Sequence, residues 1–106
     1  MDLSDDNMKQ EQSDVFLLTK PPFSQKSELC LKLAACSEKA RIYLAGDGVY
    51  HLLTGIEEQQ EFKIYACKED LEARAMRAGD KVTVLDDFYT DFIEDIMEHC
   101  RHEYTF

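Results

Sequence analysis

The sequence lacks the long apolar runs of membrane proteins and the leader of secreted ones. No apolar run approaches the roughly 20 residues that span a bilayer, and the polar start lacks the charged-then-apolar order of a signal peptide. We therefore expect a cytoplasmic protein with no membrane partner. In that compartment the cysteines are expected to stay as thiols, because cytosolic disulfides are usually transient or catalytic.

Basic residues are too few for a nucleic-acid surface. The chain has 12 Lys and Arg against 22 Asp and Glu, which gives a formal net charge of -10. Binding to a phosphate backbone needs clustered basic side chains, so no direct contact with nucleic acid is expected. The acidity lies mainly at the two ends of the chain. The nearly neutral region 14–85 is therefore the expected interface, with the acidic last helix left to water.

Motifs for metals and nucleotides are missing as well. The sequence has four cysteines, at positions 30, 36, 67 and 100, with neither CxxC spacing nor a paired ligand pattern. The spacing of His99, Cys100 and His102 fits no standard zinc site. No GxGxxG turn, Walker loop or glycine-rich first turn is present, which makes a nucleotide or flavin-binding module the least favoured hypothesis. We expect neither a metal nor a cofactor.

Short apolar segments alternate with helical patterns along most of the chain. Strands are predicted at 15–19, 41–45, 62–67 and 81–85, with a weaker one at 104–106. Helices are predicted at 24–39, 49–54, 68–78 and from 88 to about 100. This alternation predicts an α/β fold, a small Rossmann-like or flavodoxin-like parallel sheet of four to five strands with helices on both faces. Residues 1–13 are predicted to be a disordered tail, and residues 14–106 a single domain.

Helical periodicity assigns inward faces to three helices. The first has the stripe Leu29, Cys30, Leu33 and Ala34, and the third has Leu71, Ala75 and Ala78, with Gly79 as its stop. The last has Phe88, Phe92, Ile93, Ile96, Met97 and Cys100 facing inward. Its acids Asp91, Glu94, Asp95 and Glu98 are expected to face water.

The stretch 41–51, RIYLAGDGVYH, carries a strand into a tight turn and a helix. In open parallel sheets, ligands collect at the carboxyl ends of the strands, so this turn is the first candidate site. Asp47 either binds a partner or caps the following helix, and capping is the commoner role. Tyr50 and His51 are candidates to line the site, although Tyr50 equally fits a core position.

The cysteines differ in their suitability as nucleophiles. Cys67 ends a strand and opens a helix, where amide dipoles favour a thiolate. The competing interpretation, a small buried residue at a strand end, fits equally well. Cys30 lies about two turns into its helix on the apolar stripe, which favours a core position. Cys36 and Cys100 fall late in helices and are predicted to pack.

Four segments together resemble one protein family. They are LLTKPPF (17–23) followed by ELCLKLA (28–34), AGDGVY (45–50), DLEAR (70–74) and VTVLDDFYTDF (82–92). Their order and spacing are similar to the DsrH/TusB branch of the DsrE-like sulfur-relay family. The resemblance implies a small α/β fold in homo-oligomers, or in hetero-oligomers with sister DsrE-like subunits. It also implies a desulfurase or other sulfur donor as a partner.

The resemblance further implies a persulfide carrier, as in tRNA wobble-uridine 2-thiolation or cytoplasmic sulfur oxidation. Cys30 occupies the position of a first-helix cysteine found in DsrH-type members. Cys67 resembles the sulfur-carrying cysteine of sister DsrE-type subunits, which precedes a helix that carries an Arg, here Arg74. TusB-type members can lack the first-helix cysteine. The alternative is therefore a non-catalytic scaffold subunit whose sister chains carry the sulfur.

Overall fold

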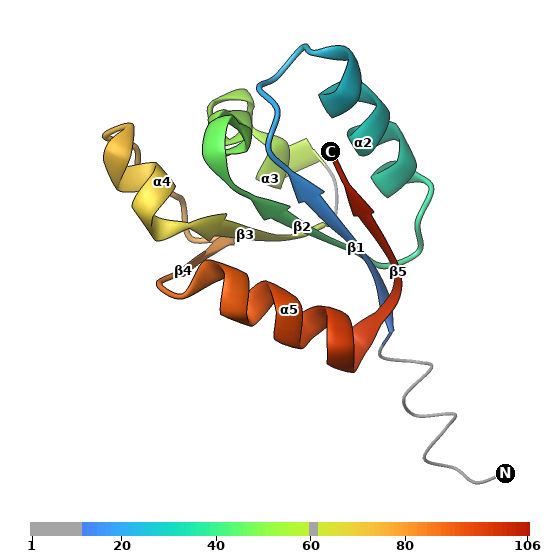
Figure 1. Cartoon of the computed structure of the whole chain (residues 1–106). Helices are drawn as coiled ribbons and strands as arrows, with labels where there is room; N and C mark the ends of the chain where they lie inside the picture. Colours follow the sequence, from blue (N-terminus) through green and yellow to red (C-terminus); the bar gives the residue numbers. More distant parts are fainter. Residues whose placement is uncertain (1–11, 60–61) are drawn as a thin grey trace, which may run out of the picture.

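The computed structural model describes residues 12–59 and 62–106, and these form one five-stranded sheet (Figure 1). The strands are β1 Ser13–Leu18, β2 Ala40–Leu44, β3 Lys63–Cys67, β4 Val82–Leu85 and β5 Cys100–Thr105. All neighbouring pairs are parallel, and the strand order is β4-β3-β2-β1-β5. The predicted α/β parallel sheet is therefore confirmed.

Helices cover both faces of this sheet (Figure 1). They are α2 Gln25–Ala35, the 3-10 helix η1 Gly46–Thr54, α3 Ile56–Gln59, α4 Lys68–Ala73 and α5 Phe88–His99. α2, η1 and α3 lie on one face, whereas α5 crosses the other. α5 connects β4 at one edge of the sheet to β5 at the opposite edge, so it runs beneath the strands between them.

The two faces of the sheet bury alternate residues of the same strands. Phe16, Leu18 and Ile42 pack with Cys30 and Ala34 of α2. On the other face, the buried residues are Val15, Leu17, Tyr43, Ala45, Cys67, Phe88 and Phe92. A strand that is buried on both faces carries a continuous apolar run, which is why β1 and β2 were predictable from composition alone.

The inward faces of α2 and α5 are narrower than predicted. Cys30 and Ala34 are buried, but Leu29 and Leu33 lie on the exposed side of α2. On α5, Phe88 and Phe92 are buried, whereas Ile93 is half exposed and Met97 is 79 % exposed. Each of these helices lies flat on the sheet, so only the residues directly above the strands are covered.

The inward face of α5 includes an acid that was expected in water. Asp95 is buried, because it lies three residues after Phe92 on the same side of the helix. Arg41 and Tyr43 of β2 bind its carboxylate, which compensates the burial of the charge.

α4 is shorter than the predicted helix 68–78. Ala75 has a φ of +52°, in the left-handed region that ends helices. The Met76 N–H donates to the Leu71 carbonyl at 2.9 Å, and the Ala75 N–H donates to the Glu72 carbonyl at 3.1 Å. These two bonds form a Schellman motif with alanine at the position that usually holds glycine. Ala75 is consequently exposed instead of facing the core.

Two predicted boundaries also shift. The predicted strand at 104–106 is the end of a longer β5, which starts at Cys100, so Cys100 is a strand residue and not the last residue of a helix. Ser13 was placed in the tail but is the first residue of β1. Residues 1–11 of that predicted tail lie outside the described residues.

Candidate functional site

The two glycines of the Gly46-Asp47-Gly48 turn are required for different reasons, Gly46 by its backbone conformation and Gly48 by a close contact. Gly46 has a φ of +55°, and its N–H donates to Oδ2 of Asp70 on α4 at 2.7 Å. A Cβ added to Gly48 would lie 1.9 Å from the carbonyl oxygen of Leu18. The turn is thus held against the end of β1 on one side and against α4 on the other.

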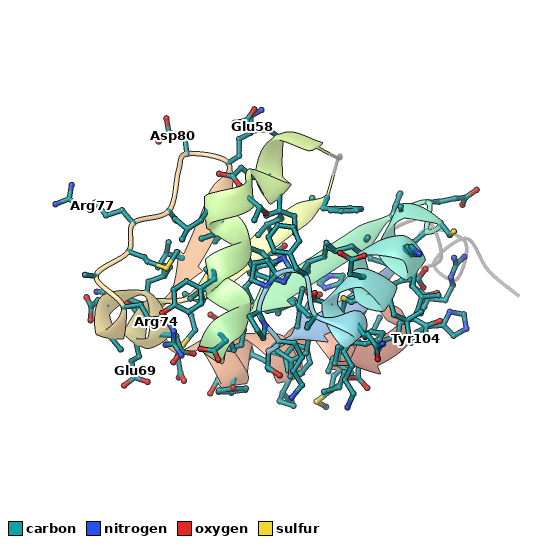
Figure 2. The ribbon with its side chains drawn as sticks, turned by 90° about the horizontal axis from the view of Figure 1, so that it is seen from above. Glu58, Glu69, Arg74, Arg77, Asp80 and Tyr104 are labelled. Carbon is teal, nitrogen blue, oxygen red and sulfur yellow. The ribbon has the colours of Figure 1, made fainter. Side chains whose placement is uncertain are left out.

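The residue between the two glycines pairs with α4. Nη2 of Arg74 donates to Oδ1 of Asp47 at 3.0 Å, and Nη1 donates to the Asp70 carbonyl oxygen at 3.1 Å. The guanidinium carbon lies 5.5 Å from the centre of the Tyr50 ring, within cation–π range. Figure 2 shows Arg74 at the end of α4, beside the η1 ribbon. The structure therefore brings together three of the predicted site residues, Asp47, Tyr50 and Arg74.

Cys67 lies at the same carboxyl edge of the sheet. It is the last residue of β3 and the N-cap of α4, as the sequence predicted, and it is 5 % exposed. Burial raises the pKa of the Cys67 thiol, and the Asp70 carboxylate raises it further. The backbone N–H groups of Glu69 and Asp70 lower the same pKa without reversing the rise. The thiol is therefore protonated at neutral pH in this conformation.

Two residues near Cys67 were missed by sequence reasoning. Asp70 joins the turn, Arg74 and Cys67 through its side chain and backbone. Tyr89, in the first turn of α5, is close enough to Cys67 and Asp70 for their charges to raise the pKa of its phenol, after the larger effect of burial. An acid in the first turn of a helix that follows a strand is a usable signal for Asp70, since that is where a carboxylate meets free amides. The sequence holds no comparable signal for Tyr89.

His51 lies apart from this group. It is buried in η1, and its Nε2 lies 3.1 Å from the Lys20 carbonyl oxygen, so the neutral ring with a proton on Nε2 donates to that oxygen. Burial lowers the pKa of His51, which favours the neutral ring. No contact described for residues 12–59 and 62–106 joins His51 to the Asp47–Arg74 pair. Its bond connects η1 to the segment after β1.

Cys30 lies in the core under α2 and is fully buried. Burial raises the pKa of its thiol to about 12. The other two cysteines also differ in exposure. Cys36 was predicted to pack but is exposed at the C-cap of α2, and Cys100 is partly buried at the start of β5.

Metal-ligand clusters are not found in the part of the chain that the structure describes, where no three His, Cys, Asp or Glu side chains gather. His99 and His102, close in sequence, bind different carboxylates, those of Asp95 and Asp14. Among the same residues, no helix has the length and apolarity needed to cross a membrane.

The sequence of the chain matches the model of a known protein family, although it matches no curated protein individually. The sequence model of the family described as DsrH-like protein matches residues 20–102. That span contains the glycine turn, Cys30, Cys67, α4 and α5, and it covers well over half of the 106 residues. The chain belongs to the DsrH-like family.

Proposed function

We propose that this protein is a sulfur-relay subunit that carries sulfur as a persulfide on Cys67. The observation that supports this most directly is the place of Cys67, which is the last residue of β3 and the N-cap of α4. The Cys67 thiolate attacks the outer sulfur of a donor persulfide. The S–S bond of the donor breaks, the donor leaves as a thiolate, and Cys67 becomes the persulfide.

The contacts favour Cys67 over Cys30 as the carrier. Cys30 is fully buried on the side of α2 that faces the core, and burial raises the pKa of its thiol to about 12. No amide of a helix start is directed at it, because it lies in the middle of α2. Cys67 lies at a helix start and next to Tyr89 of α5, which is more than half exposed. Loading at Cys67 requires neighbouring side chains to move aside, because the residue is only 5 % exposed.

Loading requires that the thiol lose its proton. The Asp70 carboxylate opposes this, and the Glu69 and Asp70 amides assist it. A donor that docks at this edge and neutralises the Asp70 charge would lower the pKa of Cys67 and so favour the thiolate. Arg74 pairs with Asp47 and holds the turn in place, so its role in this proposal is to position the edge around Cys67.

We also propose that the protein acts in an assembly, with copies of itself or with sister DsrE-like subunits, and that a desulfurase or another donor supplies the sulfur. Exposed apolar side chains support an interface. Phe23 is 84 % exposed and lines a hollow together with Leu29, and Leu33 is exposed one turn further along α2. These residues fall in the near-neutral region that was expected to form contacts. α5, expected to face water, also exposes Ile93 and Met97.

The final acceptor is proposed to be a thiol of the next protein in the relay. Sulfur delivered this way serves tRNA wobble-uridine 2-thiolation or sulfur oxidation in the two branches that the sequence resembles. The net charge of -10 argues that this subunit does not itself hold RNA. We place the relay in the cytoplasm, where a persulfide and its acceptor thiol persist.

A second candidate is a scaffold subunit that carries no sulfur. The observation in its favour is that burial raises the pKa of both Cys30 and Cys67, so neither thiol is ready to react in the isolated chain. In that case sister subunits would hold the persulfide, and this chain would shape the assembly.

Intact-mass spectrometry after incubation with a cysteine desulfurase and cysteine separates the two candidates. The relay function predicts a gain of one sulfur, removable by a reductant, on the wild type, Cys30→Ala and Cys36→Ser but not on Cys67→Ala. Cys36→Ser controls for adventitious loading of an exposed thiol. A melting curve confirms that each variant is folded. No sulfur on the wild type, with the desulfurase active on another acceptor, would support the scaffold role.

A further inference from the structure

A second polar site lies at the opposite edge of the sheet, where the strands begin. A cavity of about 450 Å³ is bounded there by the amino ends of β1, β2 and β3 and by the last turn of α5. Its polar lining residues are Ser13, Glu38, Lys39, Arg41, Lys63 and His99. None of them belongs to the group around Cys67, so the cavity is independent of the proposed relay function.

The charged side chains that line the cavity are mainly basic, whereas the molecule as a whole is acidic. Arg41, Lys39 and Lys63 line the cavity against the carboxylate of Glu38, and the buried carboxylate of Asp95 pairs with Arg41. The whole chain has a net charge of -10. Positive charge gathered in a hollow of an acidic protein attracts small anions to that hollow.

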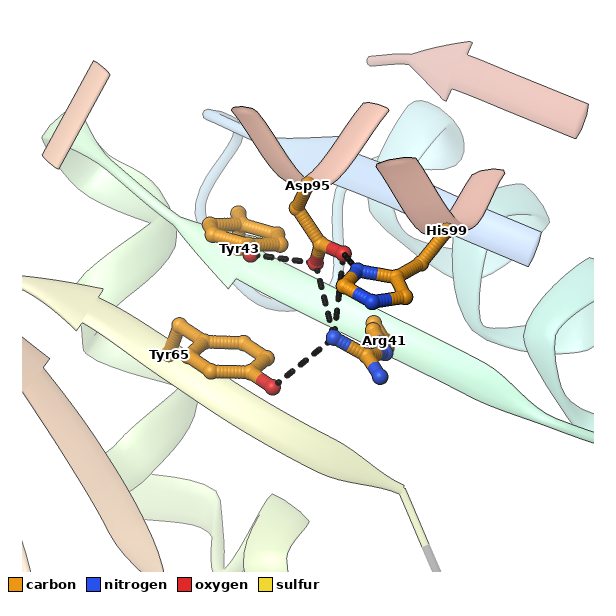
Figure 3. Close-up of polar contacts among 5 residues, drawn as sticks. All are labelled: Arg41, Tyr43, Tyr65, Asp95 and His99. Carbon is orange, nitrogen blue, oxygen red and sulfur yellow. Dashed lines mark hydrogen bonds and ion pairs between the residues drawn. The ribbon is translucent and has the colours of Figure 1, made fainter. Parts of the chain in front are cut away.

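A buried network fixes Arg41 and His99 in place (Figure 3). Nη1 of Arg41 donates to Oδ1 and Oδ2 of Asp95, at 3.0 and 3.1 Å, and lies 3.5 Å from the Tyr65 hydroxyl. The Tyr43 hydroxyl donates to Oδ2 of Asp95 at 2.5 Å. Nδ1 of His99 lies 3.1 Å from Oδ1 of the same carboxylate. One buried acid therefore orients two side chains that line the cavity, which is the preorganisation that a binding site needs.

The network uses only one end of the guanidinium. All hydrogen bonds that Arg41 donates among the described residues come from Nη1, and Nε is buried with no partner among those residues. A buried donor without an acceptor is costly. Nη2 lies on the same edge of the guanidinium as Nε and donates no hydrogen bond described for this part of the chain, and such an edge can bind a carboxylate or a phosphate through two parallel hydrogen bonds. His99 likewise commits Nδ1 to Asp95, and Nε2 makes no contact described for this part of the chain.

We propose that this cavity binds a small molecule through an oxyanion group, a phosphate or a carboxylate, with Arg41, Lys63 and His99 as its polar partners. Arg41 supplies the donors that the network leaves unused. Lys63, exposed at the start of β3, supplies the second positive charge. Asp95 acts as a positioning residue, because it holds Arg41 and His99 and is itself buried.

The test is a titration followed by ¹H–¹⁵N NMR, with inorganic phosphate in one arm and citrate in the other. Chloride holds the ionic strength constant. We expect saturable shifts of the Arg41 Nε–H signal and of the backbone signals of Lys63 and His99. The arm that saturates at the lower concentration identifies the oxyanion.

Two variants of exposed lysines make the test specific. Lys63→Gln removes a charge from the cavity and should weaken binding about tenfold, the effect of one charge-assisted hydrogen bond. Lys26→Gln removes the same charge from the exposed side of α2 and should leave the affinity unchanged. Linear shifts in both arms, or equal weakening by both variants, would overturn the proposal, since either shows only general screening of an acidic protein.

Discussion

The backbone N–H of Gly46 donates a hydrogen bond to the carboxylate of Asp70, with 2.7 Å between N and Oδ2. The same carboxylate raises the pKa of Cys67. One side chain thus holds the turn after β2 against α4 and adds to the larger effect of burial in raising the pKa of the neighbouring thiol. The rigidity of the edge and the reactivity of its cysteine depend on the same charge.

Replacing Asp70 with Asn should make Cys67 more reactive. The amide oxygen of Asn can still accept from Gly46, but the charge that raises the Cys67 pKa is gone, so more thiolate is present at a given pH. Site-resolved mass spectrometry of iodoacetamide labelling at a series of pH values should show a lower apparent pKa for Cys67. Glu72→Gln, on the same helix, is the control. Identical titrations of Cys67 in the wild type and Asp70→Asn would contradict the role given to Asp70.

Glycine at position 75 should stabilise the protein. Ala75 has a φ of +52°, and an L-residue in the left-handed region is about 1 kcal/mol less favourable than glycine there. Ala75→Gly should therefore raise the free energy of unfolding by up to about 1 kcal/mol in a urea titration. Ala73→Gly, at the last helical position of α4, should have the opposite effect. A loss of stability in both variants would show that the Schellman motif does not form.

Alanine at position 48 should be severely destabilising. Its Cβ would fall 1.9 Å from the Leu18 carbonyl oxygen, so η1 would have to move away from the end of β1. We expect a loss of about 3 kcal/mol, the upper range for overpacking. Gly55→Ala is the matched control, because Gly55 has a φ of +74° and nothing within 4 Å of an added Cβ. Its loss should be only about 1 kcal/mol. Equal losses would contradict the steric argument.

The stability of the fold should fall in mild acid because of His51. Burial lowers the pKa of His51 below the ordinary 6.5, so the unfolded chain binds the proton more readily. The stabilisation is complete above about pH 6.5 and is lost as the pH falls from there toward the folded-state pKa. For one proton, the slope reaches at most about 1.4 kcal/mol per pH unit.

Urea titrations between neutral pH and mild acid measure that slope. His51→Gln, whose amide can donate to the Lys20 carbonyl, should flatten it. An unchanged slope in this variant would contradict the role given to His51. Asp14 adds a separate loss in stronger acid. The hydrogen bond from Ser37 and the neighbouring His102 and Arg101 lower its pKa from 3.8, despite its burial, so its stabilisation fades only below that value.

Loss of the Asp95 charge should destabilise the sheet. Asp95→Asn leaves Arg41 largely buried beside a neutral group, and breaking a buried pair in this way costs about 3 kcal/mol or more. Glu94→Gln, at an exposed position one residue earlier, should change stability very little. Thermal unfolding of the two variants measures the difference. Similar melting temperatures would mean that the network in Figure 3 adds nothing to stability.

The sequence predicted the layers of this fold better than its polar interior. Apolar β-rich runs identified β1 to β4, and their alternation with helices implied parallel strands. The same reasoning placed Cys67 correctly between β3 and α4 and named Asp47 and Tyr50 as candidate site residues, whereas Arg74 was named from the family resemblance. The strand order could not be predicted, because periodicity says which face of an element is apolar and not which element lies beside it.

Asp95 shows why the rest was missed. An acid on a helix is usually solvated, so it was assigned to the water-facing side, although its spacing from Phe88 and Phe92 places it on their stripe. Its partner Arg41 is far away in sequence, and the two residues meet only because α5 packs across β2. The early end of α4 was hidden for a similar reason, since alanine normally continues a helix.

β1 is synthesised first but gains its second neighbour last. Its pairing with β2 closes a short loop, whereas Thr19 meets Phe106 across 87 residues. Long-range pairing of this kind is slow. Until α5 docks, Val15, Leu17 and Tyr43 form an uncovered apolar surface on a sheet that still lacks β5. A chain in which β1 to β3 have paired but α5 has not yet docked is therefore prone to aggregate through this surface.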